Sequence, residues 1–453
     1  MHISTLSWRW TLGIATFAML FQTAFSYVAQ IVMPILADRV AEEFGISRGW
    51  LGLYLFLQNF VAIVAAIGCG GFILRYGPLR VSQISLALMA VSLLVISTGI
   101  LWLYPMAALL MGTSAASTPA SSHILARVCP PHIAPVIFSV KQTGVPVGAL
   151  IGGLLLPFLL GLVFYSATLG TTVRLGTYGT AAVTAFIVFT VVIALQPIRE
   201  HFDSARNPQQ KISLGDLRTT MRMVLDNYPL RDIAFAAFAF GGLQSVFAGF
   251  FILFMIDGLG HSEVSAGQVF AIASFCAIWA RILWGILGGS ILTPRRVFSI
   301  IGLISAVSAV AILWIDTTWS ISAILVVAIF YNISALSWHG ILLAEVARLV
   351  PANEVGGTTG GVLAFTSIAM MIYPAIFGLL LALTDSYKIG FALASIPAFI
   401  AFVMFIYGPV PGPWTGALAS TLERACCWRN AVRVAAVMSA GIVVGIVMFR
   451  FTG

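Results

Sequence analysis

Charged residues are scarce in this sequence: they make up only 8% of its 453 residues, whereas 60% are hydrophobic. A water-soluble chain of this length needs far more polar surface. The apolar residues also come in repeated runs of about 20, the length that a helix needs to cross the hydrocarbon core of a bilayer. The scarcity of charge therefore excludes a soluble globular protein and indicates a polytopic membrane protein whose main surroundings are the lipid bilayer.

Strict alternation of apolar and polar residues, which marks the strands of a membrane β-barrel, is missing from the apolar runs. Residues 81–103 and 297–314 are apolar on every face, so the spanning unit is a helix. Cysteine is also scarce: the five cysteines include no CxxC pair. We expect neither a structural disulfide nor a metal site.

Catalytic signatures are missing as well. The sequence has no HExxH or GxSxG motif and no paired carboxylates inside a span, and its loops are too short for a soluble active site. The glycine-rich run 144–153 lacks the GKS or GKT ending of a phosphate-binding loop. We expect a protein that is not an enzyme and needs no cofactor. The net charge of +8 comes from basic residues scattered among short loops, which argues against nucleic acid as a partner.

Twelve membrane spans are predicted from apolar length and from breaks at charge, proline and glycine. They cover residues 10–36, 50–73, 81–103, 105–126, 135–163, 177–195, 233–256, 266–287, 297–314, 321–343, 357–383 and 389–407. With the N-terminus in the cytoplasm, the cytoplasmic segments up to the last span hold thirteen Lys and Arg residues and the opposite side holds four. The positive-inside rule therefore predicts a cytoplasmic N-terminus.

The predicted organisation has four parts. Residues 1–195 form a six-helix bundle, 196–232 a polar cytoplasmic linker with six basic residues, and 233–407 a second six-helix bundle. Residues 408–453 form a C-terminal extension. Within it, residues 434–449 form an apolar run of 16 residues, short for a span. Arg433 and Arg450 flank this run and would allow a slightly thinned crossing, so we expect a thirteenth helix that transport does not need.

An internal repeat relates the two bundles. The segment GGFILRYGPLRV after the second span and the segment GGSILTPRRV after the eighth share GGxIL followed by Pro-x-Arg-Val. ILARV at the end of the fourth span matches LLAEV at the end of the tenth, and each precedes a proline-containing loop and a Thr-Gly pair that opens the next span. The six-span unit is therefore predicted to be duplicated in the same orientation.

These residues resemble the major facilitator superfamily over about residues 10–407. The loop motif of that family between its second and third helices, GxxxDRxGRR, aligns with Gly70, Arg75 and Gly77, with Arg80 one place late and Leu74 where the family has an acid. The resemblance implies a twelve-helix transporter that works by alternating access in a bacterial plasma (inner) membrane. It also implies that this loop and its repeat, with Arg295 and Arg296, gate the cytoplasmic side. Because the family acid helps to latch the two halves, Leu74 implies altered gating contacts.

Two further stretches are similar to bacterial members of the superfamily. They are KQTGVPVG, which begins at Lys141, and SWHG with AEVAR, in which His339 stands where those members have Asn. Both support the fold and leave the substrate open, because the superfamily carries sugars, drugs, peptides and anions on one scaffold.

Two basic residues lie at membrane depth. Lys141 is predicted about 9 Å into the fifth span at 1.5 Å per residue, and Arg281 lies at a similar distance from the cytoplasmic end of the eighth. A cation at such depth costs about 2.5 to 3.5 kcal/mol unless it has a partner or faces water. No acid is predicted inside a span, and the nearest are Asp257 and Glu345 at span ends. The pattern favours an anionic substrate as counter-ion. Lys141 could instead reach the cytoplasmic surface or contact backbone carbonyls there, and Arg281 could make a gating contact with a loop carbonyl or with Glu345.

Other polar side chains at membrane depth could complete a substrate site. They are Tyr27, Gln58, Gln142, Gln244, Asn332 and His339. Each could equally form a hydrogen bond between helices, and His339 could also carry a coupling proton. The sequence thus predicts a monomeric transporter of a small organic anion. The alternative is an efflux transporter for drugs or amphiphiles, which an aromatic-rich cavity without acids keeps open.

Overall fold

The computed structural model describes residues 7–46, 50–166, 171–213 and 215–407. By their contacts, the residues divide into two compact units, Met1–Met223 with Val346–Ala364, and Val224–Glu345 with Phe365–Gly453. The predicted C-terminal extension and its thirteenth helix lie outside the described residues. The segment 346–364, predicted as part of the second bundle, contacts the first unit.

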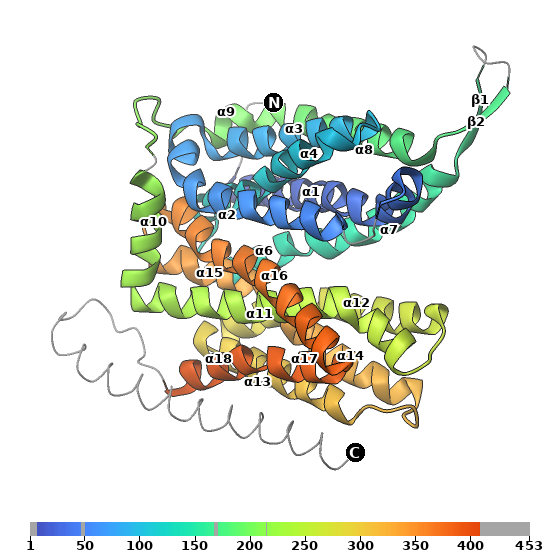
Figure 1. Ribbon diagram of the computed structural model, residues 1–453. Helices are drawn as coiled ribbons and strands as arrows, with labels where there is room; N and C mark the ends of the chain where they lie inside the picture. The colour runs from blue at the N-terminus through green and yellow to red at the C-terminus, as the bar shows by residue number, and fades with distance from the viewer. Residues whose placement is uncertain (1–6, 47–49, 167–170, 214, 408–453) are drawn as a thin grey trace. The chain divides into compact units, whose positions relative to one another are not determined.

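The first unit is almost entirely helical (Figure 1). Its elements are α1 (Trp8–Phe44), α2 (Trp50–Tyr76), α3 (Pro78–Ser97), η2 (Leu101–Leu103), α4 (Tyr104–Gly112), η3 (Thr113–Ala116), α5 (Ser117–Val128), α6 (Ala134–Gln142), α7 (Gly144–Gly161), β1 (Val163–Ser166), β2 (Thr171–Arg174), α8 (Gly176–Ala194), η4 (Gln196–Ile198), α9 (Arg199–Phe202) and α10 (Gly215–Asp226). Helix α10 begins in this unit and ends in the second.

Helices α1 and α7 pack closely because α7 presents glycine to α1 at four-residue intervals. A Cβ at Gly144 would lie 2.6 Å from the carbonyl oxygen of Leu20, and one at Gly148 would overlap the carbonyl oxygen of Ala24. At Gly152, a Cβ would overlap the side chain of Ile31. Small residues at this spacing allow two helices to approach at backbone distance.

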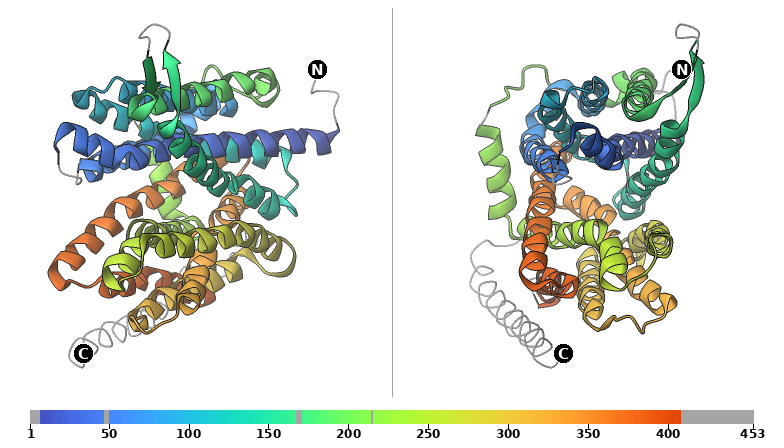
Figure 2. Two further views of the ribbon diagram at one scale, coloured as in Figure 1. Left: turned by 90° about the vertical axis from the view of Figure 1, so that its right-hand side faces the viewer. Right: turned by 45° about the vertical axis from the view of Figure 1, so that its right-hand side comes forward.

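Two features of the first unit were not predicted. The fourth span is divided into α4 and α5 by the 3₁₀ turn η3, where the Thr113 hydroxyl donates to the carbonyl of Leu110 at 2.7 Å. Strands β1 and β2 form an antiparallel hairpin, with Val163 opposite Arg174, that extends away from the helices of this unit in Figures 1 and 2. The hairpin joins α7 to α8, where the sequence predicted a loop.

The second unit is helical in its described residues. Its elements are α11 (Tyr228–Leu253), η5 (Phe254–Gly258), α12 (Glu263–Ile286), η6 (Leu287–Ile291), α13 (Pro294–Ala311), η7 (Ile312–Trp314), α14 (Ile321–Ala335), α15 (His339–Leu349), α16 (Val355–Thr384), α17 (Tyr387–Ala394) and α18 (Ile396–Tyr407). Helices α14 and α15 together correspond to one predicted span, interrupted between Ala335 and His339. Helices α15 and α16 each include residues of both units.

Eleven helical stretches among the described residues are long and apolar enough to cross a membrane. They match eleven of the twelve predicted spans, and the remaining one is the divided span α4–η3–α5. The helical membrane fold is therefore confirmed. The start of α11 differs, since the helix begins at Tyr228 and not at Ile233. Consequently Asp232 is a buried helical residue, and the prediction that no acid lies inside a span was wrong.

Candidate substrate site and gating loops

Lys141 lies in the last turn of α6, next to the break at Thr143 that separates α6 from α7. Its side chain is fully buried, and among the described residues its Nζ has no hydrogen-bond partner. Gln142 beside it is also buried. An ammonium removed from water without a partner is strongly unfavourable, which makes Lys141 the candidate position for an anion in this unit.

The same unit contains Tyr27 and Gln58. Tyr27 lies on the face of α1 that contacts α7, where a Cβ at Gly148 would be 3.0 Å from the Tyr27 Cβ. Because Gly148 follows Lys141 by seven residues, Tyr27 lies about two helical turns beyond the level of Lys141. Gln58 is half-buried on α2, and its Oε1 has no hydrogen-bond partner in the described chain. Tyr27 is therefore placed beside α7, the helix that follows Lys141 across the break, whereas Gln58 belongs to α2.

Several buried polar residues of the first unit were not selected by the sequence analysis, and Gln22 is among them. Gln22 on α1 is fully buried, and neither its Oε1 nor its Nε2 has a hydrogen-bond partner among the described residues. A buried amide left unpaired costs about 1 to 3 kcal/mol. The signal was available in the sequence, since Gln22 interrupts an apolar run in the same way as the polar residues that were selected.

Arg281 lies on α12 and is almost fully buried. Its Nη2 donates to the backbone carbonyl of Leu336 at 2.8 Å, in the interruption between α14 and α15. The Ser337 hydroxyl donates back to the carbonyl of Ala277 on α12 at 2.9 Å. Arg281 thus binds a carbonyl that the interrupted helix leaves exposed, which is one of the two roles that the sequence allowed for it.

The predicted polar residues of the second unit gather near this interruption. Asn332 is fully buried, its Nδ2 donates to the carbonyl of Ala328 at 2.9 Å, and its Oδ1 has no partner in the described chain. His339 begins α15 and stacks on Trp338, with ring centroids 3.7 Å apart. Gln244 follows Leu243, whose carbonyl accepts the Tyr331 hydroxyl of α14 at 3.0 Å. Arg281, Asn332 and His339 therefore surround one break in the helix.

The predicted gating loop of the first unit is held by the segment that follows α8. Asp203 is buried, and its carboxylate accepts the backbone N–H groups of Leu79 at 2.8 Å and Arg80 at 3.0 Å at the start of α3. Gly77 has φ of +94°, and a Cβ there would overlap the Asp203 side chain. Asp203 therefore caps α3 through backbone contacts that glycine alone permits at position 77.

Neighbouring residues strengthen this connection. The carbonyl of Leu74, at the position where the family has an acid, accepts the backbone N–H of Asn207 at 2.8 Å. The Arg75 Nη1 donates to the carbonyl of Gln210 at 3.4 Å. At Gly70, a Cβ would lie 2.9 Å from the Cα of Gly357 at the start of α16, within the same unit. The loop is thus fastened to its own unit by residues 203–210.

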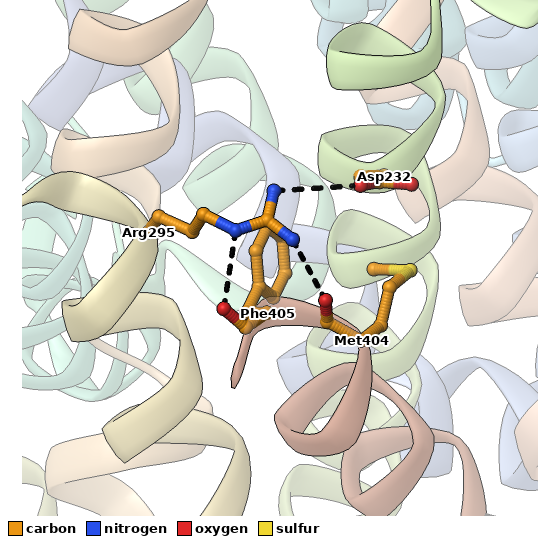
Figure 3. A network of polar contacts seen from close by, with 4 residues as sticks. All are labelled: Asp232, Arg295, Met404 and Phe405. Carbon is orange, nitrogen blue, oxygen red and sulfur yellow. Dashed lines mark hydrogen bonds and ion pairs between the residues drawn. The ribbon is translucent and has the colours of Figure 1, made fainter. Parts of the chain in front are cut away.

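The corresponding loop of the second unit is fastened by an arginine (Figure 3). Arg295 donates from Nη2 to the carbonyl of Met404 at 2.8 Å and from Nε to the carbonyl of Phe405 at 3.1 Å. Its Nη1 lies 3.7 Å from the Asp232 carboxylate. Arg296 is exposed, and its backbone N–H donates to the Thr293 hydroxyl that caps α13. Arg295 therefore joins α13 to α11 and α18. Its pairing with Asp232 compensates the negative charge of that buried carboxylate.

Comparisons with known proteins agree with this architecture. A family model described as Major Facilitator Superfamily matches residues 12–351 and 233–452. The chain is 26% identical over 201 residues to the probable galactarate/D-glucarate transporter GudP of Bacillus subtilis (strain 168), which covers 42% of this chain and 43% of that protein. It is 21% identical over 210 residues to the probable galactarate/D-glucarate transporter GudP of Escherichia coli (strain K12). This match covers 44% of this chain and 45% of that protein. The matches thus span less than half the length of these relatives.

Solved structures give a longer match at lower identity. The human organic anion transporter MFSD10 has a TM-score of 0.69 at 14% identity, covering 87% of this chain and 99% of that chain. The proton:xylose symporter XylE has a TM-score of 0.64 at 15% identity, covering 87% and 95%. At these identities the likeness establishes the fold alone.

Proposed function

Because the chain belongs to the major facilitator superfamily, we propose that this multi-pass membrane transporter carries a small organic anion that binds at Lys141. The observation that carries the proposal is the fully buried Lys141 Nζ without a partner in the described chain. An anionic group of the substrate would supply the missing counter-charge and convert an unfavourable burial into a charge-assisted hydrogen bond.

The names of the relatives support a carboxylate as the substrate. The curated relatives are named as probable transporters of galactarate and D-glucarate, and one structural neighbour is named as an organic anion transporter. Hydroxylated carboxylates also suit the residue beside Lys141, because the Gln142 amide can exchange hydrogen bonds with hydroxyl groups. We therefore take a hydroxylated mono- or dicarboxylate as the substrate.

Transport by this mechanism requires alternating access. In the proposal, residues 10–195 rock against residues 233–407, and the loops 70–80 and 288–296 move with the bundles to which they are fastened. In the proposal the N-terminus lies in the cytoplasm, the orientation that the positive-inside rule favours. His339, half-buried at the start of α15, is the group we assign to a coupling proton.

Uptake into proteoliposomes tests the function. The purified chain would be assayed with D-glucarate, galactarate, a neutral sugar of the same size and a cationic dye, each with and without an inward proton gradient. Saturable uptake of a carboxylate, with no uptake of the neutral sugar, is expected. Transport of the dye without any carboxylate would contradict the proposal and support the efflux alternative.

A further inference from the structure

An apolar groove lies in the second unit, apart from the residues proposed for transport. It has a volume of about 300 Å³ and is lined by Leu225, Arg231, Phe235, Phe238, Phe365 and Ile368. We call it the α11–α16 groove after the two helices that form most of its wall. The surface inside it is apolar, so Arg231 contributes its aliphatic stem.

The groove has a polar end and an apolar end. Arg231, Phe235 and Phe238 are spaced by four and three residues and so share one face of α11. Arg231 lies in the first turn of the helix and is exposed, whereas Phe235 and Phe238 are half-buried further along. On α16, Phe365 and Ile368 are likewise three residues apart. Along α11 the groove therefore begins with the cationic Arg231 and continues with aromatic residues further into the helix.

The charged residue in the lining of the groove is Arg231. Helix α10, before the groove, carries Arg218 and Arg222 but also Asp216 and Asp226, so its net charge is zero; its exposed Leu225 forms part of the groove. An arginine guanidinium binds a phosphate through charge-assisted hydrogen bonds. The groove therefore combines an apolar slot with the Arg231 guanidinium at its polar end, which complements an amphiphile with a phosphate head.

We propose that the α11–α16 groove binds one acyl chain of an anionic phospholipid, with the headgroup phosphate at Arg231. The guanidinium has five N–H donors, so it can bind a phosphate and keep its contacts within the protein. A lipid in this position contacts the end of α10 at Leu225 together with α11 and α16, all within the second unit. This binding is independent of the substrate proposed above.

Photolabelling of the purified full-length chain tests the site. The probes are phosphatidylglycerol and phosphatidylcholine that carry the same diazirine-bearing acyl chain, added in neutral detergent, with the labelled residues mapped by peptide mass spectrometry. We expect phosphatidylglycerol to label the peptides that carry Phe235, Phe238, Phe365 or Ile368 at least fivefold more than phosphatidylcholine does. Arg231→Gln should reduce this labelling to the phosphatidylcholine level, whereas Arg296→Gln, which removes an exposed arginine of the same unit, should not.

A second variant tests the site without changing a charge, in case Arg231→Gln disturbs folding. Ile368→Trp fills the groove with an apolar side chain and should prevent labelling by both lipids, while the elution volume of the protein stays unchanged. Equal labelling by the two lipids would show only nonspecific contact with the bilayer and would overturn the proposal. Absence of label from all four positions in the unmodified chain would show that protein fills the groove, with the same consequence.

Discussion

Single glycine positions determine how closely α1 and α7 pack. Gly148 meets the backbone carbonyl of Ala24, so an added methyl group has no flexible side chain to displace. Gly153, on the same helix, has open space around its Cβ position. The two positions therefore allow one substitution to be compared in a crowded and an open environment.

Gly148→Ala should destabilise the protein by about 1 to 3 kcal/mol, because α1 and α7 must separate to accept the methyl group. Gly153→Ala should leave stability unchanged or raise it slightly, since alanine favours the helix. Thermal unfolding in detergent measures both. Equal melting temperatures for the two variants would show that the close approach at Gly148 contributes nothing.

Arg295 and Arg296 are adjacent, yet only Arg295 is held in a network of protein contacts. Arg295→Gln should lower the free energy of unfolding by about 3 kcal/mol, because it leaves the buried Asp232 without its partner and two carbonyls without donors. Arg296→Gln should have little effect because its side chain is exposed. Denaturation of both variants in the same detergent distinguishes them, and equal losses would contradict the structural role of Arg295.

Among the elements, α3 depends on a cap that lies far away in the sequence. Asp203→Ala should cost about 0.5 to 2 kcal/mol, because two N–H groups at the start of α3 lose their acceptor. The matched control is Glu200→Gln, an exposed acid on α9. Hydrogen exchange at Leu79 and Arg80 should increase in the Asp203 variant alone. Unchanged protection there would show that the cap is not needed.

Most membrane helices could be predicted from the sequence, because an apolar run of about 20 residues satisfies its backbone hydrogen bonds in lipid by forming a helix. The divided fourth span was missed, since Thr113 and its neighbours are compatible with a continuous helix and the 3₁₀ turn depends on packing. The start of α11 could have been found from Pro229, which lies in the first turn, where proline is favoured. Asp203 could not have been predicted as a cap, because 123 and 124 residues separate it from its partners.

The candidate site was only partly accessible to sequence reasoning. A lysine within an apolar run is visible in the sequence as a charge at membrane depth, and Lys141 was selected for that reason. Whether a buried cation has a partner depends on contacts between distant segments, so the sequence could not distinguish Lys141 from Arg281. The structure does so, because a carbonyl of the interrupted helix accepts a hydrogen bond from Arg281.

At the scale of the whole molecule, rocking of residues 10–195 against 233–407 requires the start of α16, which the contacts group with α2 in the first unit, to separate from α2. A Cβ at Gly356 would lie 2.8 Å from the Ile73 Cδ1, so the two positions are neighbours, and a cysteine pair there is suited to a cross-linking test. In a background without the native cysteines, oxidation of Ile73→Cys/Gly356→Cys should abolish transport, and a reductant should restore it. Each single-cysteine variant serves as control. Full activity of the cross-linked protein would rule out this movement.

The most direct test of the account is the apparent affinity for the transported carboxylate after Lys141→Gln. Because the cation is lost, the substrate concentration at half-maximal proteoliposome uptake should rise at least tenfold, which corresponds to about 1.4 kcal/mol of binding free energy. Lys141→Arg should retain part of the affinity. Lys211→Gln, at an exposed linker lysine, should retain all of it. Unchanged affinity and rate in Lys141→Gln at normal protein levels would show that Lys141 does not bind the substrate and would contradict the account.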